Sequence, residues 1–110
     1  MNDEIKLKTG GLLFTWDDEK AKINEKKHDI SFYMATEVFF DKYAYEEPDY
    51  TTDEERYRII GRGQLFNSPI LFVVFTERVY SINDEGKQVF RIISARKAKG
   101  KELDKYYEVY

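Results

Sequence analysis

Three strand-like segments follow one another in the second half of the chain, and they limit its possible folds more than any other feature. Residues 56–62 alternate with a period of two, residues 70–75 are a continuous apolar run, and residues 89–95 form a third such segment. Alternation predicts a half-buried strand, whereas a continuous apolar run predicts a central strand covered on both faces. The turn-like sequences between the segments, at 63–69 and 83–86, predict an antiparallel meander.

Two helices are predicted before the meander. Residues 18–27 are rich in Glu, Lys and Ala without Gly or Pro, and Asp17 is a suitable N-cap for them. Ser31 is expected to cap a second helix after His28–Ile30 breaks the first. The apolar side chains of this second helix lie at helical spacing, which predicts that they face the core. They are Phe32, Ala35, Val38 and Phe39.

The remaining segments complete the expected order of elements. Residues 12–14 are predicted to form an opening strand, and residues 1–11 a flexible or extended N-terminal segment. A short edge strand is expected near Ala44 and Tyr45, within a loop that leads into the sheet. A last helix should begin near Gly100, because an apolar stripe follows at positions i, i+3, i+4 and i+7. That stripe consists of Leu103, Tyr106, Tyr107 and Tyr110.

The segments together predict an α+β fold with the order β-α-α-β-β-β-α. An antiparallel β-sheet would pack against two N-terminal helices and a C-terminal helix, because helices and strands are segregated along the chain. The 110 residues fit a single domain, residues 1–110, of a size that buries a sufficient core. Trp16, at a strand-to-helix junction, is expected to be structural.

Composition excludes several classes of protein. The chain has no cysteine, which removes disulfides, zinc–thiolate sites and thiol nucleophiles. No apolar run approaches the roughly 18 residues of a membrane span, so we expect a cytoplasmic protein with no membrane partner. Phosphate-binding glycine loops, His–Glu zinc patterns, Ser-His-Asp sets and calcium loops are absent from the sequence. We therefore expect neither a cofactor nor a metal ion.

Charge is distributed unevenly along the chain. The net charge is −3, which by itself argues against a nucleic-acid-binding protein. Residues 37–55 are strongly acidic, however, and residues 86–105 are rich in Lys and Arg. The basic segment suggests a polyanionic partner, although ordinary solvated surface explains it equally well.

Two blocks of sequence resemble the BrnT family of toxins over roughly residues 13–110. The first block comprises Phe14-Thr15-Trp16-Asp17, Lys20, Asn24, Lys27-His28, Ile30, Phe32 and Ala35. The second comprises Glu55-Arg56, Gly61, Thr76-Glu77, the run from Arg91 to Ala98, Glu102 and Tyr106. The chain departs from the family pattern in a longer segment before Thr15 and in Lys42, which stands where a proline is expected.

The resemblance implies a RelE-like fold and the toxin of a type II toxin–antitoxin system. It implies a ribonuclease that cleaves RNA and arrests translation and growth. The partners implied are a cognate BrnA-like ribbon-helix-helix antitoxin and the RNA substrate, with operator DNA bound only through the antitoxin complex. Acidic antitoxin segments would then be expected on the basic strip that contains Arg91, Arg96 and Lys97.

Metal-independent RNA cleavage needs positive charge around the pentacoordinate phosphorus, and arginine supplies it with a planar group that donates two hydrogen bonds. We rank Arg91 and Arg96 first as catalytic candidates, because both interrupt an apolar strand, and Arg56 next. Arg58 and Lys97 are candidate RNA-binding residues. Strict alternation places Arg91 and Lys97 on one face and Arg96 on the other, unless a bulge intervenes. In the alternative interpretation, such an arginine pairs with Glu55 or Glu77.

Four further residues are candidates with competing structural roles. His28 is the only histidine and suits proton transfer, but it also suits a helix C-terminus. Glu77 is a candidate general base, although an ion pair with Arg91 would explain it as well. Lys20 and Lys27 share a helical face with Asn24 and are candidate RNA-binding residues. Asn24 would alternatively bond to the adjoining loop, and Lys27 would be solvated surface.

Two other interpretations of function remain open. The chain would be a nonenzymatic binding module that acts in operator binding within a toxin–antitoxin complex, or an inactive member of its family. The tyrosine stripe near the C-terminus is attributed to helix packing, with an antitoxin surface or a hydroxyl near the substrate as alternatives.

Overall fold

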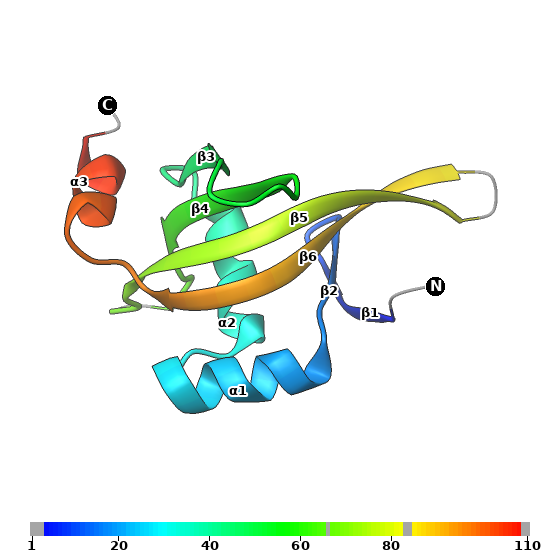
Figure 1. Cartoon of the computed structure of the whole chain (residues 1–110), viewed down its shortest axis with the longest axis horizontal. Helices are drawn as coiled ribbons and strands as arrows, with labels where there is room; N and C mark the ends of the chain where they lie inside the picture. The colour runs from blue at the N-terminus through cyan, green and yellow to red at the C-terminus, as the bar shows by residue number, and fades with distance from the viewer. Residues whose placement is uncertain (1–3, 66, 83–84, 109–110) are drawn as a thin grey trace.

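The computed structural model describes residues 4–65, 67–82 and 85–108, and it has an α+β fold with a six-stranded sheet (Figure 1). The elements in chain order are β1 (Ile5–Thr9), β2 (Leu12–Thr15), α1 (Asp18–His28), α2 (Phe32–Glu37), the 3₁₀ helix η1 (Val38–Phe40), β3 (Tyr45–Asp49), β4 (Arg56–Arg62), β5 (Ile70–Ile82), β6 (Glu85–Lys97) and α3 (Lys101–Tyr107). The helix positions and the predicted edge strand at Tyr45 are confirmed.

The sheet has the strand order β1-β2-β6-β5-β4-β3. Strands β3 to β6 are antiparallel neighbours, which confirms the predicted meander. The prediction of a wholly antiparallel sheet was wrong, because β2 pairs with β6 in parallel. The chain between β2 and β6 passes through two α-helices, the 3₁₀ helix η1 and three strands, so no short turn dictates their relative direction.

Part of the N-terminal segment is extended, which is one of the two forms predicted for residues 1–11, but its pairing within the sheet was not predicted. Residues 5–9 form a strand, β1, which pairs antiparallel with β2, so this part of segment 1–11 belongs to the sheet. Gly10 and Gly11 join the two strands with φ values of 56° and 82°, a conformation that glycine adopts without steric cost. The observed order is therefore β-β-α-α-β-β-β-β-α, and the RelE-like description stays a prediction.

Strands β5 and β6 are each 13 residues long, far longer than their predicted apolar cores. Figure 1 shows them extending together beyond the ends of β4 and β2 as a two-stranded ribbon. Of the predicted turn at 83–86, Glu85 and Gly86 belong to β6, whereas residues 83–84 lie outside the described residues.

A β-bulge in β6 decides which side chains share a face of the sheet. Val74 is opposite Ser94, but Phe75 is opposite Ile92, so Ile93 is an extra residue without a partner in β5. Beyond the bulge the alternation of faces is reversed. The face that carries Ile92 before the bulge therefore carries Ala95 after it, and both side chains are buried in the same core.

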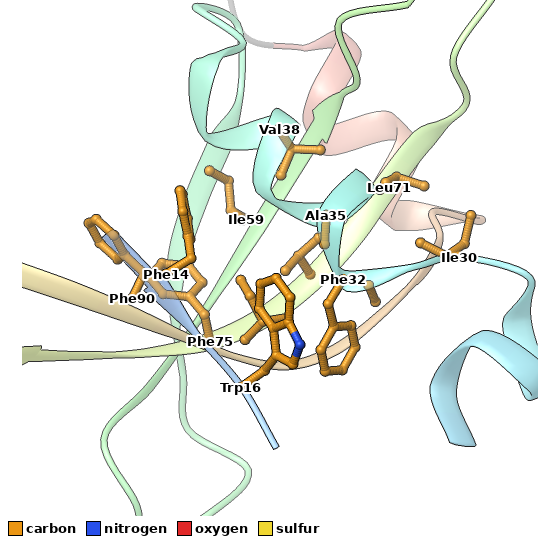
Figure 2. Close-up of a cluster of buried hydrophobic side chains, with 13 residues drawn as sticks. Phe14, Trp16, Ile30, Phe32, Ala35, Val38, Ile59, Leu71, Phe75 and Phe90 are labelled. Atoms are coloured by element: carbon orange, nitrogen blue, oxygen red, sulfur yellow. The ribbon is translucent and has the colours of Figure 1, made fainter. Parts of the chain in front are cut away.

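The main core lies between one face of the sheet and helices α1 and α2; this face is termed the helix face. Thirteen buried residues form the core, and Figure 2 shows that they come from both layers. Trp16 is only 6% exposed and its ring meets those of Phe32 and Tyr33 edge-on, which confirms its structural role. Asp17 and Ser31 cap α1 and α2 as predicted, by accepting hydrogen bonds from Lys20 N and Met34 N.

Asn24 takes the place of a neighbouring strand at the edge of β6. Strand β2 pairs with β6 only as far as Arg91, and beyond this point α1 packs beside β6. The Asn24 amide donates to Ala95 O at 2.8 Å and to Ile30 O at 3.1 Å, and its oxygen accepts from Ala95 N at 3.1 Å. These bonds explain an asparagine within a helix and confirm the predicted contact with the adjoining loop.

We predict that Asn24→Ala lowers the free energy of unfolding by about 2–3 kcal/mol, because it leaves three buried backbone groups without partners. Urea unfolding of the variant beside Lys26→Ala, an exposed change on the same helix, measures this. A loss below about 0.5 kcal/mol, the usual range of a surface substitution, would show that the Asn24 bonds do not hold α1 to β6.

Candidate active site

The face of the sheet opposite α1 and α2 carries most of the arginines. Cross-strand partners share a face, so the register assigns Arg58 with Val74 and Ser94, and Arg91 with Thr76, to this side. We call this surface the arginine face. Among the side chains that the structure describes, its polar residues on β4, β5 and β6 are Arg56, Arg58, Arg62, Thr76, Arg78, Arg91, Ser94 and Arg96.

The bulge at Ile93 decides the grouping of basic residues on β6. Arg96 is opposite Phe72 on the arginine face, the same face as Arg91, whereas Lys97 is opposite Leu71 on the helix face. Strict alternation would have put Arg91 and Lys97 on one face, but the extra residue lies between them, which is the exception that the prediction allowed. The two arginines ranked first in the sequence are brought to one side of the sheet.

Arg56, Thr76 and Arg91 form a row across three neighbouring strands. Thr76 is opposite Arg91, and the β4–β5 register continued by one residue from Tyr57–Phe75 places Arg56 opposite Thr76. Adjacent strands lie about 4.8 Å apart, so the two arginine backbones are roughly 10 Å apart with the threonine between them. Side chains of this length reach a single phosphate group placed above Thr76.

Among the described side chains of the arginine face, two polar atoms are buried and make no hydrogen bond. They are Nε of Arg58 and Oγ1 of Thr76, which lie in successive rows of the sheet. An unsatisfied buried donor costs about 1–3 kcal/mol, so such atoms are uncommon in a folded protein. Both atoms can donate a hydrogen bond.

Two arginines of β4, Arg56 and Arg58, form ion pairs with carboxylates. Arg56 pairs with Glu54 at 2.8 Å and Arg58 pairs with Glu47 at 3.1 Å. Glu54 is exposed, with 67% of its side-chain surface accessible, and ion pairs with exposed groups contribute at most about 1 kcal/mol. An incoming phosphate can therefore replace Glu54 on Arg56 at small cost. Neither of the predicted partners, Glu55 and Glu77, takes part in these two ion pairs.

Helix α3 covers the other end of the arginine face. Tyr106 packs with Ile60, Ile70 and Phe72 in a second, smaller core. Arg96 donates two hydrogen bonds to Glu102 in α3, at 2.8 and 2.7 Å, and its guanidinium lies 4.4 Å from the centre of the Phe72 ring. Arg96 is thus engaged in holding α3 against the sheet.

Asp41 also holds α3 against the sheet, through a hydrogen bond from Tyr106. Tyr106 donates its hydroxyl proton to Asp41 at 2.6 Å, and the backbone N–H groups of Arg62 and Tyr43 donate at 2.8 and 2.9 Å. Burial alone raises the pKa of Asp41, but these hydrogen bonds outweigh it and the pKa ends below its ordinary value. Burial and the bond to Asp41 raise the pKa of Tyr106. Of the predicted apolar stripe, Leu103 and Tyr106 pack in this smaller core as expected. Tyr107 is 53% exposed, so the packing role predicted for it was wrong, and Tyr110 lies outside the described residues.

We predict that Asp41→Asn lowers the free energy of unfolding by about 1–2 kcal/mol at pH 7. Because the folded pKa of Asp41 is lowered, its stabilisation is complete above the unfolded value near 4 and is lost as the pH falls through the folded value. The difference between variant and wild type should therefore narrow in acid. Urea unfolding from pH 7 to pH 3 tests this, and a difference that stays constant would contradict it.

Glu77 does not belong to the arginine face. It is opposite Phe90 on the helix face, and it accepts a hydrogen bond from Gln88 at 3.0 Å. Arg91 lies on the opposite face, opposite Thr76. This arrangement contradicts the predicted cross-strand pair of Glu77 with Arg91, and it separates Glu77 from the row of arginines.

Three basic residues of α1 gather at the free edge of β6. Lys20, Lys27 and His28 line one hollow of about 250 Å³ together with Ile93 and Ser94 of β6. His28 is the last residue of α1, followed by Asp29 in a left-handed conformation, as expected for a helix C-terminus. These residues lie beside the arginine face rather than on it.

Sequence reasoning missed Thr76 and Ser94 as members of the site. Thr76 follows directly after the continuous apolar run of β5, so a polar residue at that point was a usable signal. Ser94 gave no such signal, because its face depends on the bulge beside it. Within the described residues, no three His, Cys, Asp or Glu side chains are placed to hold a metal ion, and no helix there is long and apolar enough to cross a membrane.

Comparison with known proteins assigns the family. A search of curated proteins finds no match to the chain. A family model described as the ribonuclease toxin BrnT of type II toxin–antitoxin systems matches residues 16–102. The matched segment includes all three strands of the arginine face. The chain therefore belongs to the BrnT family of ribonuclease toxins of type II toxin–antitoxin systems.

Proposed function

We propose that this protein cleaves RNA on the arginine face, without a metal ion, and that Arg56 and Arg91 bind the phosphate at which cleavage occurs. The observation that carries the proposal is the row of Arg56, Thr76 and Arg91 across three adjacent strands. Two positive charges on either side of a buried, unsatisfied hydroxyl suit a dianionic group. The ribonuclease description of the family supports the same class of reaction.

The reaction that this row supports is attack by the 2′-hydroxyl on the adjacent phosphorus. The hydroxyl gives its proton to solvent water as its oxygen bonds to phosphorus, and the bond from phosphorus to the 5′-oxygen breaks as that oxygen takes a proton from water. The products are a 2′,3′-cyclic phosphate and a 5′-hydroxyl. Negative charge grows on the phosphoryl oxygens between these events. Fixed arginines that meet this charge lower the barrier because they need no reorganisation during the reaction.

The second row of the arginine face would also bind the RNA substrate. Arg58 and Ser94 lie one row from Arg56 and Arg91, at the level of Val74. The unsatisfied Nε of Arg58 is a donor already in place, while the rest of its guanidinium is fixed by Glu47. We assign Arg58 to substrate binding, and Arg96 to positioning of α3 through Glu102.

The cellular role follows from the family. Cleavage would arrest translation and growth in the cytoplasm, and a BrnA-like ribbon-helix-helix antitoxin would neutralise the toxin. An acidic antitoxin segment on the arginine face would compete with RNA for the same cations. Operator DNA would be bound by the complex through the antitoxin.

We predict that Arg91→Ala and Arg56→Ala each lower kcat/KM for RNA cleavage by roughly 100-fold, since each removes a donor to the developing charge. Because both would act on one phosphate, the double variant should lose less than the product of the single losses. Cleavage of a fluorescent oligoribonucleotide by the purified proteins, in buffer with EDTA, measures these values.

Lys97→Ala is the matched control, since it removes a nearby cation on the same strand but on the opposite face. It should cleave at the wild-type rate. Equal activity of wild type and arginine variants would contradict the proposal. Absence of cleavage by the wild type, with growth unaffected when it is produced without antitoxin, would favour an inactive family member. Operator binding that requires the toxin, in the same absence of cleavage, would favour a binding module.

A further inference from the structure

The hollow between α1 and the free edge of β6 adjoins the arginine face. Ser94 lies on the arginine face and also lines this hollow, so the two surfaces are continuous at that residue. Ser94 is roughly 7 Å along the sheet from Arg91, because their partners in β5, Val74 and Thr76, are two residues apart and the bulge takes up the third residue. A bound RNA strand that leaves the row at Arg91 would next meet this hollow.

The bulge and Asn24 together create the hollow. Ile93 has no partner in β5, and strand β2 does not extend this far along β6. The Asn24 bonds to Ala95 hold α1 in place beside the bulge. The basic side of α1 is therefore held at a constant position relative to Arg91 and Ser94.

The chemistry of the hollow suits a nucleotide. Its titratable side chains are Lys20, Lys27 and His28, and no carboxylate is among the described residues that line it. Within the described part of the chain neither lysine forms a salt bridge, although Lys20 lies close enough to Asp17 to attract its carboxylate. Ile23, 63% exposed, supplies an apolar surface at the same place.

Resting on the proposed function, we infer that this hollow is a substrate subsite for the nucleotide next to the cleaved phosphate. Lys20 and Lys27 bind the flanking phosphate, with His28 beside them. The base or ribose packs against Ile23 and Ile93. His28 thereby takes part in RNA binding at the edge of β6, away from the row that binds the cleaved phosphate.

The test compares two double variants of α1 that carry the same change of charge. Lys20→Ala/Lys27→Ala removes the cations of the hollow, whereas Lys22→Ala/Lys26→Ala removes two lysines from the opposite side of the helix. Cleavage of a single-stranded octaribonucleotide is measured as kcat and KM at several salt concentrations. Circular dichroism establishes that both variants are folded.

We expect Lys20→Ala/Lys27→Ala to raise KM on the order of tenfold with kcat nearly unchanged, because the lysines bind substrate and transition state alike. The dependence of log kcat/KM on log salt should become less steep by about 0.7 for each phosphate that the variant no longer binds. The control variant should resemble the wild type. Equal effects of the two double variants, or a fall in kcat alone, would overturn the inference.

Failure of the proposed function is recognised separately. If the wild type cleaves no RNA, binding of a 2′-O-methyl octaribonucleotide by the same variants still tests the subsite. Weaker binding only in Lys20→Ala/Lys27→Ala would support it, and equal binding would overturn it. If that variant instead cleaves normally but escapes neutralisation by the antitoxin, the hollow binds the antitoxin and the inference is wrong.

Discussion

The hydrogen bonds between the Asn24 side chain and the backbone of β6 are the contact on which the rest of the structure depends. Strand β6 is the only strand among the described residues that joins the meander to β2, and beyond Arg91 its outer edge has no strand partner. Asn24 satisfies Ala95 on both its N–H and its C=O, as a strand would. Since an open edge exposes unpaired backbone groups, this one side chain allows a helix to lie where a strand would otherwise be needed.

The bulge at Ile93 has consequences on both faces of the sheet. On the helix face it keeps Ala95 in the core after Ile92, and on the other face it brings Arg96 into line with Arg91. In a regular strand, Ala95 would lie on the face opposite Ile92, and Arg96 on the face opposite Arg91. The two faces then serve different purposes: one is buried under α1 and α2, while the other presents arginines between α3 and the projecting β5–β6 ribbon.

Local sequence signals predicted the helices, their caps at Asp17 and Ser31 and the meander, because these depend on spacing and on one or two side chains. The parallel pairing of β2 with β6 depends on contacts between residues far apart in the chain, and no local pattern carries it. The same holds for the candidate site. Arg56 and Arg91 were chosen from residue type, but their common row required the register, and the separation of Glu77 and Lys97 required the bulge.

The central claim is that RNA binds the arginine face through Arg56, Arg58 and Arg91. NMR spectra of the protein with 15N-labelled arginine, recorded during titration with a 2′-O-methyl oligoribonucleotide, test it most directly, because each guanidinium Nε–H gives its own signal. We expect the signals of these three arginines to shift together, whereas that of Arg62, bonded to Ser68 and Tyr107 beside α3, stays in place. Shifts at Arg62 alone, or saturable binding that leaves the three signals unmoved, would contradict the claim.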